Sequence, residues 1–293
     1  MEIGIIGSGA IGLLFGFHLS ENHSVRLYTR RKEQAEALNR DGIVLKNLTG
    51  DNRQRKISAD TSDNYQEEFL IVAVKQYQLK EIAASLKGCR ERKKLLFLQN
   101  GMDHLSILKE LSQQHDCYAG VVEHGARKES ENTVKHTGMG KTNLGSFGTG
   151  AAEELALQLD SPAFPFQWKE NCRVMLAEKL LINTCINPLT ALLGIKNGEL
   201  ISNSQYNLMM RSVFEEAFAI LKLTDKEKSW DKVQEICAKT HHNVSSMLAD
   251  IQSGRVTEID AILGYLIKLS PFPETNAPII VFLYRSIKGK ETS

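Results

Sequence analysis

Short apolar runs and helix-like segments alternate through the first 165 residues of the chain. The short runs are rich in Ile, Leu, Val and Phe, a composition that predicts buried strands. They cover residues 2–6, 24–28, 69–74, 95–98 and 118–122. Apolar positions at helical spacing lie between several of them, as in residues 13–19 and 32–40. Strands separated by helices predict an α/β fold with a mostly parallel, doubly wound sheet.

The pattern of apolar positions changes farther along the chain. Residues 43–58 form a polar, hairpin-like stretch, and the region from 133 to 148 is β-like and rich in glycine. The proline-containing segment 160–165 resembles a domain boundary, and beyond it the spacing is helical almost to the end. The sequence therefore predicts an α/β domain over residues 1–165 and an all-α domain over residues 166–293.

A glycine-rich turn follows the first predicted strand. The sequence Gly7-Ser8-Gly9-Ala10-Ile11-Gly12 matches G-x-G-x-x-G and leads into an apolar helical segment. In such a turn Gly7 allows the tight reversal, Gly9 lets a pyrophosphate approach the backbone, and Gly12 lets the helix pack closely on the strand. The amides at the start of the helix then face the diphosphate. The motif predicts a Rossmann domain that binds a dinucleotide through this turn.

The apolar N-terminus also has an alternative interpretation as a secretion signal. A signal peptide needs a basic start, an unbroken apolar helix and a small-residue cleavage site. Here Glu2 is the only charged residue before the apolar run, glycine interrupts that run repeatedly, and no cleavage-like tripeptide follows. The strand, turn and helix interpretation explains the glycines, so we favour it.

The end of the second predicted strand indicates which dinucleotide is bound. An NAD-binding protein usually places Asp or Glu there to hold the ribose 2′-hydroxyl. This chain has Thr29-Arg30-Arg31-Lys32 instead. Guanidinium groups can bind a 2′-phosphate through paired, charge-assisted hydrogen bonds, so the sequence predicts NADPH as the cofactor. The alternative is that these residues are only the solvated, basic start of the next helix.

Composition and charge exclude several other functions. Lys and Arg number 36 against 35 Asp and Glu, and without a basic face or long charge block we expect no nucleic-acid or membrane partner. The five cysteines are widely spaced, as in a cytoplasmic protein with reduced thiols. Metal-ligand motifs such as H-E-x-x-H are missing from the sequence, so we expect no metal site. No apolar run is long enough for a membrane helix.

A polar stripe interrupts an apolar helical segment in the second half. Lys179, Asn183 and Asn187 are four residues apart, which places them on one face of a helix whose end Pro188 could bend. The alternative is the solvated side of an ordinary amphipathic helix. Asparagine is a poor choice for that role, because Glu, Lys or Gln cost less on a helix surface. Spacing alone leaves both interpretations open.

Two later segments also resemble functional sites. Residues 241–248 are a run of small polar side chains inside a helical pattern. In the segment Arg255-Val256-Thr257-Glu258-Ile259-Asp260, Thr257 is placed to cap a helix and Glu258 to lie in its first turn. Acidic residues are favoured at helix starts by the helix dipole, so position alone does not make Glu258 catalytic.

Taken together, the motifs resemble those of the ketopantoate reductases, or 2-dehydropantoate 2-reductases. The pieces that carry the resemblance are GSGAIG, AVKQYQ, QNGM, EKLLINTCINPLTAL, KNGEL, NVSSMLADI and TEID, in that order along nearly the whole chain. The resemblance implies a Rossmann domain and a helical domain like that of 6-phosphogluconate dehydrogenase, with the active site in the cleft between them. It also implies reduction of ketopantoate to (R)-pantoate by NADPH, a step toward pantothenate and coenzyme A, and a homodimer is compatible with the family.

The resemblance further implies roles for individual residues. Lys179 matches the proton-donating lysine, and Glu258 matches the acid that contacts the substrate and supports that lysine. The positions that match substrate-binding residues are Asn100, Asn183, Asn187, Asn197, Asn243 and Ser246. Arg30 and Lys75 match residues that favour the 2′-phosphate, although the pair Arg30-Arg31 leaves open which arginine makes the contact. Asn100 and Ala126 line the cofactor path.

Two other functions remain open from the sequence. One is an NADPH-dependent reductase of another 2-keto acid, which would share the fold. The other is a non-catalytic NADPH-sensing protein. A sensor needs the glycine-rich turn but no proton donor, so the set of Lys179, Asn183, Asn187 and Glu258 argues against it.

Overall fold

The computed structural model describes residues 1–47, 50–148 and 150–292 and divides the chain into two compact units. The first unit comprises Met1–Gln99 and His104–Met175. The second comprises Asn100–Asp103 and the chain from Leu176 onward. In the part of the chain that the structure describes, no helix is both long enough and apolar enough to cross a membrane.

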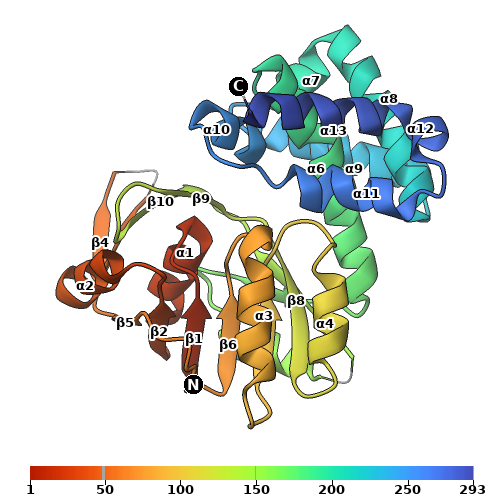
Figure 1. Ribbon diagram of the computed structural model, residues 1–293. Helices are drawn as coiled ribbons and strands as arrows, with labels where there is room; N and C mark the ends of the chain where they lie inside the picture. The colour runs from red at the N-terminus through yellow and green to blue at the C-terminus, as the bar shows by residue number, and fades with distance from the viewer. Residues whose placement is uncertain (48–49, 149, 293) are drawn as a thin grey trace. The chain divides into compact units, whose positions relative to one another are not determined.

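An eight-stranded sheet forms the centre of the first unit (Figure 1). Its order is β12-β11-β8-β7-β6-β1-β2-β5, and all neighbours are parallel except the antiparallel pair β8–β11. The strands are β1 (Glu2–Ile6), β2 (Ser24–Tyr28), β5 (Ser58–Asp60), β6 (Phe69–Val72), β7 (Lys94–Phe97), β8 (Asp116–Val122), β11 (Thr142–Phe147) and β12 (Phe166–Trp168). The predicted α/β fold with a mostly parallel sheet is confirmed.

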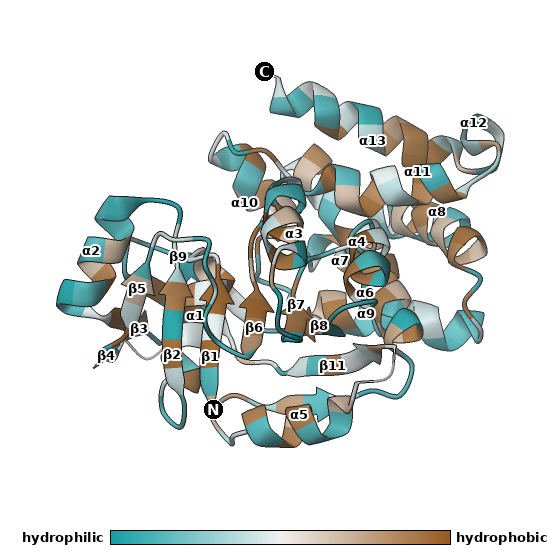
Figure 2. Cartoon of the chain, turned by 60° about the horizontal axis from the view of Figure 1, so that its bottom comes forward, coloured by the Kyte–Doolittle hydropathy of each residue, from teal (hydrophilic) through white to brown (hydrophobic). Residues whose placement is uncertain are grey.

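Strand β1 lies at the switch point of this sheet. The chain continues from β1 to β2 on one side and later crosses to β6 on the other. Ligands of such sheets bind beyond the carboxyl ends of the strands at this point. The helices between the strands are α1 (Ala10–Leu19), α2 (Lys32–Asp41), the 3₁₀ turn η1 (Gln76–Gln78), α3 (Leu79–Lys87), α4 (Leu105–Leu111) and α5 (Ala152–Leu159). Figure 2 shows β6 and β7 as mostly hydrophobic and α2 as mostly hydrophilic.

A second, four-stranded sheet covers the glycine-flanked helix α1. Its order is β4 (Asn52–Arg55), β3 (Ile43–Lys46), β10 (Thr133–Gly138) and β9 (Gly125–Lys128). The predicted hairpin is the antiparallel pair β3–β4, and residues 48–49 of that stretch lie outside the described residues. Helix α1 contacts β1 and β2 of the large sheet and β3, β9 and β10 of the small one. A helix that is apolar all round must be covered on all sides, which explains the signal-like sequence of this segment.

The boundary between the units falls later than the expected residue 166. Residues Phe166–Trp168 form β12, which pairs in parallel with β11 of the large sheet. The described division lies between Met175 and Leu176, within helix α6 (Cys172–Leu193). The apolar spacing after residue 165 therefore did not predict the short edge strand β12, because three residues are too few to show a period.

From Leu176 onward the second unit is helical (Figure 1). Helix α6 continues through Pro188 to Leu193, so the proline does not end it. The other helical elements are α7 (Glu199–Ser202), α8 (Ser204–Leu221), α9 (Lys226–Lys239), α10 (Ser246–Gln252), the π-helical turn η2 (Asp260–Gly264), α11 (Tyr265–Leu269), α12 (Pro273–Asn276) and α13 (Pro278–Glu291). The predicted helical C-terminal domain is confirmed apart from its first residues.

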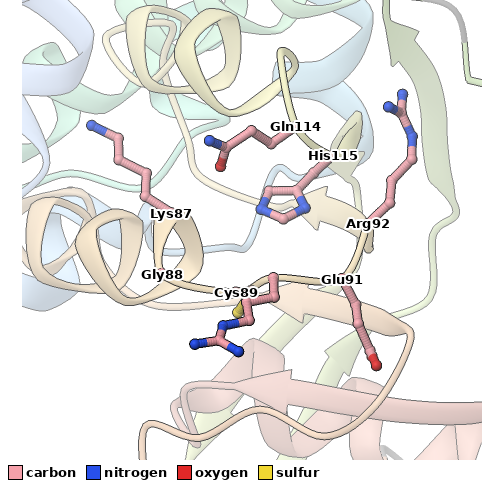
Figure 3. A pocket seen from close by; sticks show the side chains of 8 residues that line it. Lys87, Gly88, Cys89, Glu91, Arg92, Gln114 and His115 are labelled. Atoms are coloured by element: carbon pink, nitrogen blue, oxygen red, sulfur yellow. The ribbon is translucent and has the colours of Figure 1, made fainter.

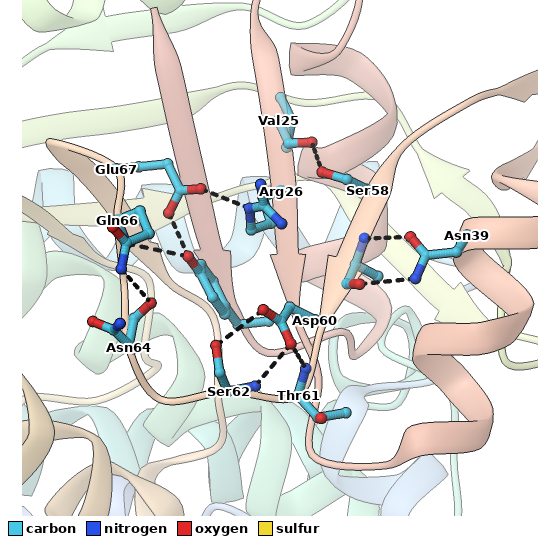
Figure 4. A network of polar contacts seen from close by, with 12 residues as sticks. Val25, Arg26, Asn39, Ser58, Asp60, Thr61, Ser62, Asn64, Gln66 and Glu67 are labelled. Carbon is cyan, nitrogen blue, oxygen red and sulfur yellow. Dashed lines mark hydrogen bonds and ion pairs between the residues drawn. The ribbon is translucent and has the colours of Figure 1, made fainter.

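A buried carboxylate joins strand β2 to the segment before β6. Glu67 is only 7% exposed, and it accepts a hydrogen bond of 2.6 Å from the Tyr28 hydroxyl and one of 3.0 Å from Arg26 Nε (Figure 4). Burial, together with the bond to Glu67, raises the pKa of Tyr28 above its usual value. The interaction holds the end of β2, where the chain continues into Arg30 and Arg31.

Replacing this carboxylate should destabilise the first unit. We expect Glu67→Leu to lower the free energy of unfolding by about 1–3 kcal/mol, because the buried Tyr28 hydroxyl loses its acceptor. The control is Glu68→Leu, since Glu68 is exposed. Denaturant unfolding followed by Trp168 fluorescence in a Trp230→Phe background reports on the first unit, because these are the two tryptophans of the chain. Equal losses in both variants would contradict the prediction.

Three histidine side chains form a cluster in the first unit, and two of them contact Phe164. The rings of His18 and His124 stack on Phe164 with centroids 4.5 and 4.3 Å away, and His124 Nδ1 lies 3.2 Å from His136 Nε2. Burial lowers the pKa of His18 to about 4 and that of His124 to about 3, and the neighbouring His136 adds to both shifts. The pKa of His136 is also lowered by burial. The folded cluster is therefore neutral at pH 7.

This cluster should make the first unit sensitive to acid. Below pH 6.5 these histidines bind protons in the unfolded chain but not in the folded one, where their pKa is lower. The free energy of unfolding therefore falls as the pH drops toward 4. The maximal slope is about 1.4 kcal/mol per pH unit for each histidine. Denaturant unfolding between pH 7.5 and 5 should show this slope, and His124→Phe should reduce it. A slope unchanged in the variant would contradict the assignment.

Candidate active site

The glycine turn after β1 has the geometry that the motif predicts. Gly7 has φ +105°, and its backbone N–H donates to Tyr28 O at 2.9 Å. A Cβ on Gly12 would lie 1.8 Å from Gly7 O, so only glycine lets α1 approach the turn. A Cβ on Gly9 would have no atom of the described residues within 4 Å. The backbone at Gly9 is thus open to a ligand, as a bound diphosphate requires.

The N-terminus of α1 can accept an anion. Gly9 is its N-cap, and the described residues provide no side-chain cap and no acidic residue in its first turn. The helix dipole and the first backbone amides therefore face an uncompensated site, which favours a phosphate group. Residues Gly7, Ser8, Gly9, Ala10, Ile11 and Gly12 fit the diphosphate of a dinucleotide.

The two arginines after β2 differ in their surroundings. Arg31 forms an ion pair with Glu131, which precedes β10. Among the residues that the structure describes, the side chain of Arg30 forms no ion pair or hydrogen bond, and it is exposed. This difference favours Arg30 as the group available to a phosphate, a choice that the sequence left open.

Two other predicted cofactor residues, Lys75 and Ala126, lie in the first unit. Lys75 is half-buried and follows Ala73, whose backbone N–H donates to Ile6 O of β1 at 2.8 Å. Lys75 therefore lies beyond the carboxyl end of β6, next to the switch point. Ala126 lies on β9, paired with His136, and is half-buried against the core.

The polar stripe of α6 is largely buried. Asn183 and Asn187 are 8% and 9% exposed, and Lys179 is half-buried one turn before them. This burial excludes the alternative of a solvated helix side. Amide groups removed from water need hydrogen-bonding partners, which a bound polar ligand can supply.

Asn100 and Glu258 meet in the second unit. Asn100 Nδ2 donates to Glu258 Oε2 at 2.9 Å. The short segment Asn100–Asp103 groups with the second unit because it fits closely against η2, where a Cβ on Gly101 would lie 2.1 Å from Ala261 O. Glu258 is half-buried and precedes a π-helical turn, a feature frequent at functional sites.

The segment between α9 and α10 is a loop that packs against the residues after α6. The predicted helical pattern over residues 241–245 is therefore wrong, since these residues connect the two helices. The backbone N–H of buried Asn197 donates to Asn243 O at 3.1 Å, and Asn197 Nδ2 donates to Thr240 Oγ1 at 2.9 Å. Asn243 and Ser246 themselves are exposed.

The capping contact expected of Thr257 is present, since its Oγ1 accepts from Ile259 N–H at 3.1 Å. The backbone oxygen of Glu258 accepts from Ile262 N at 3.2 Å, so Glu258 lies at the start of the helical turn that leads into η2. Thr257 also donates from Oγ1 to Glu291 Oε1 at 2.7 Å, and its backbone N–H donates to the same oxygen at 2.8 Å. A carboxylate of the last helix thus holds the residue before Glu258, a contact that no local pattern encodes.

The sequence did not single out the contact that joins α6 to α10. Thr190 Oγ1 donates to Ser245 Oγ at 2.7 Å, and Ser245 is the N-cap of α10, where its Oγ accepts from Leu248 N at 3.1 Å. Thr190 lies one turn after Asn187, and Ser245 precedes Ser246. The pair therefore fixes the start of α10 against the polar stripe. The only signal in the sequence was that both residues lie within the motifs that resemble the family.

A surface pocket of the first unit is not part of this site. Its lining residues, shown in Figure 3, are Lys87, Gly88, Cys89, Arg90, Glu91, Arg92, Gln114 and His115. They precede β7 and β8, which places the pocket at the amino ends of these strands, opposite to the ligand-binding edge. In the described chain, no group of three or more His, Cys, Asp or Glu side chains is placed to hold a metal ion.

The glycine turn at the switch point and the stripe of half-buried Lys179 with buried Asn183 and Asn187 indicate the class of protein, a dinucleotide-dependent oxidoreductase with an α/β unit and a helical unit. Comparison with known families is more specific. Residues 3–149 match the family model described as Ketopantoate reductase PanE/ApbA, and residues 171–291 match Ketopantoate reductase PanE/ApbA C terminal. The chain belongs to the ketopantoate reductase family.

Individual relatives agree with this family. The chain is 44% identical to the 2-dehydropantoate 2-reductase of Bacillus subtilis (strain 168), covering 99% of this chain and 98% of the relative. The crystal structure of a probable 2-dehydropantoate 2-reductase from Bacillus subtilis is similar at a TM-score of 0.90 and 43% identity, covering 99% and 100% of the two chains. A ternary structure of D-mandelate dehydrogenase with NADH and anilino(oxo)acetate has a TM-score of 0.91 at 23% identity over 100% and 99%, which shows a shared fold only.

The contact between Thr190 and Ser245 should hold the start of α10. We expect Thr190→Val to speed amide hydrogen exchange over residues 246–252, because the buried Ser245 hydroxyl loses its hydrogen bond to α6 and keeps only the one from Leu248 N. Thr190→Ser should keep the protection. Thr184→Val is the matched control, since the buried Thr184 hydroxyl on the same helix has no hydrogen-bond partner among the described residues. Equal exchange in the Thr190→Val and Thr184→Val variants would contradict this role.

Proposed function

We propose that the protein reduces 2-dehydropantoate (ketopantoate) to (R)-pantoate with NADPH, a step toward pantothenate and coenzyme A. The observation that carries the proposal is the buried amide pair Asn183 and Asn187 on the same helix face as Lys179. A cation beside buried hydrogen-bonding groups suits an anionic, oxygen-rich keto acid. The membership of the whole chain in the ketopantoate reductase family supports the same substrate.

The chemistry assigns separate tasks to the residues of the second unit. Bound NADPH supplies a hydride to the carbonyl carbon of the keto acid. Lys179 donates a proton to the carbonyl oxygen, where negative charge develops, and thereby stabilises the transition state. Glu258 contacts the substrate and supports the lysine, and the hydrogen bond from Asn100 fixes one of its carboxylate oxygens at 2.9 Å.

The remaining polar residues select the substrate. Asn183, Asn187 and Asn197 are buried, so an analogue that leaves their amides unpaired is rejected. Asn243 and Ser246 are exposed at the start of α10 and bind the carboxylate or the terminal hydroxyl group. The buried Oδ1 of Asn197 has no donor among the described residues, which fits a hydroxyl group of the ligand.

The choice of NADPH rests on charge at the end of β2. Thr29 occupies the region where NAD-binding proteins usually carry an acid, and the exposed Arg30 follows it. Arg30 and Lys75 bind the 2′-phosphate, while Asn100 and Ala126 line the cofactor path. Arg30 and Lys75 supply positive charge where NADPH carries two more negative charges than NADH.

The proposal includes a cytoplasmic homodimer. The cytoplasm would keep the thiols of Cys89, Cys117, Cys172, Cys185 and Cys237 reduced, as they are in the structure. The second unit exposes large apolar side chains on several helices and their connections, and an interface between two copies would cover such groups. They include Leu208, Phe272 and Phe282.

The first test is NADPH oxidation with ketopantoate by the wild type and by Lys179→Ala. We expect kcat to fall by about 10²-fold or more in the variant, because the proton donor is lost, while the Kd for NADPH is retained. Lys239→Ala is the control, since Lys239 is an exposed lysine of α9. A Lys179→Ala variant with full activity would exclude Lys179 as the proton donor.

A panel of 2-keto acids separates the alternatives. Activity on another 2-keto acid but not on ketopantoate would show a reductase of different specificity. Binding of NADPH without oxidation on any member of the panel would show a sensing protein and overturn the catalytic proposal.

A further inference from the structure

A carboxylate lies beside the arginines that follow β2. Glu131 stands in the turn between β9 and β10 and forms an ion pair with Arg31, whose side chain is 49% exposed against 38% for Glu131. Lys128 Nζ also lies 3.1 Å from Glu131 Oε2. The Arg31 guanidinium holds the pKa of Glu131 below its usual value, so the carboxylate is charged at neutral pH.

A buried glutamine fixes this turn to the dinucleotide-binding loop. Gln34 of α2 is buried, and its Nε2 donates to Ser8 O at 2.9 Å and to Glu131 O at 2.7 Å. One side chain thus connects the glycine turn, the start of α2 and the β9–β10 turn. The backbone of Glu131 is therefore held next to the glycine turn, and its negative charge lies beside Arg31, which follows the end of β2.

We propose that Glu131 is a specificity-determining residue of the cofactor site: its carboxylate occupies Arg31, so that Arg30 alone of the two arginines contacts the 2′-phosphate. The inference rests on the proposed use of NADPH. It adds a residue that lowers the affinity of the site for this cofactor. A carboxylate repels the 2′-phosphate and competes for its cation, whereas NADH carries a hydroxyl group there and loses little. The preference for NADPH is thereby lower than the two arginines would give without Glu131.

The test measures the Kd of NADPH and of NADH by calorimetric titration. We expect Glu131→Gln to bind NADPH about 3- to 10-fold more tightly, as for the loss of one partly screened charge, and NADH within about 2-fold of the wild type. The gain should be larger at low than at high salt. Glu129→Gln is the matched control, because Glu129 lies in the same turn and pairs with Lys46 and Arg127 instead.

The arginine variants identify the group that acts. Arg30→Ala should weaken NADPH binding by about 10-fold or more and leave NADH unchanged, whereas Arg31→Ala should have a much smaller effect. In an Arg31→Ala background, Glu131→Gln should no longer tighten NADPH binding by much. This result would show that the tighter binding comes from freeing Arg31 of its ion pair and not from freeing Lys128.

Distinct outcomes overturn the inference and the proposed cofactor. The role of Glu131 is overturned, and the proposed cofactor is not, by either of two results. One is a ratio of NADH to NADPH Kd that Glu131→Gln leaves unchanged, and the other is NADPH binding at least 10-fold weaker in Arg31→Ala. A wild type that binds NADH more tightly than NADPH, or binds neither, overturns the proposed cofactor and the inference together.

Discussion

The close approach of Gly12 to the carbonyl oxygen of Gly7 is the constraint on which the first unit depends. A Cβ at Gly12 would lie 1.8 Å from that oxygen, so any side chain would push α1 away from β1. The same contact forms the turn at the switch point of the sheet and directs the first amides of α1 toward a ligand. The lack of a side chain at Gly12 is therefore needed both for the packing of α1 and for the shape of the cofactor turn.

The apolar surface of α1 determines what else surrounds the turn. Because this helix is apolar on every side, the four-stranded sheet must cover the face that the large sheet leaves open. The turn between β9 and β10 belongs to that covering sheet, and Gln34 joins it to Ser8. The sheet that buries α1 thus also places Glu131 beside Arg31. The packing of the core therefore determines which charged groups lie near the glycine turn.

The second unit uses buried polar groups in a different way. Asn183, Asn187 and Thr190 lie on or near one face of α6, and the hydroxyl of Thr190 reaches Ser245 at the start of α10. Buried hydrogen bonds of this kind are costly to break, so they hold the loop before α10 in one arrangement. The side chain of Glu258 accepts a hydrogen bond from Asn100, and its backbone is held by the bond from Ile259 N–H to Thr257 Oγ1. A reacting group keeps its position best when its neighbours are fixed in this way.

The sequence by itself determined the elements whose cause is local. Period and glycine spacing predicted β1, the turn and α1, and the four-residue spacing predicted that Lys179, Asn183 and Asn187 share a helix face. Tertiary structure alone decided features that join distant residues, because no local period records them. These include the parallel pairing of β3 with β10, the edge strand β12 and the burial of the stripe. They also include the ion pair of Arg31 with Glu131, which distinguishes two adjacent arginines that look equivalent in the sequence.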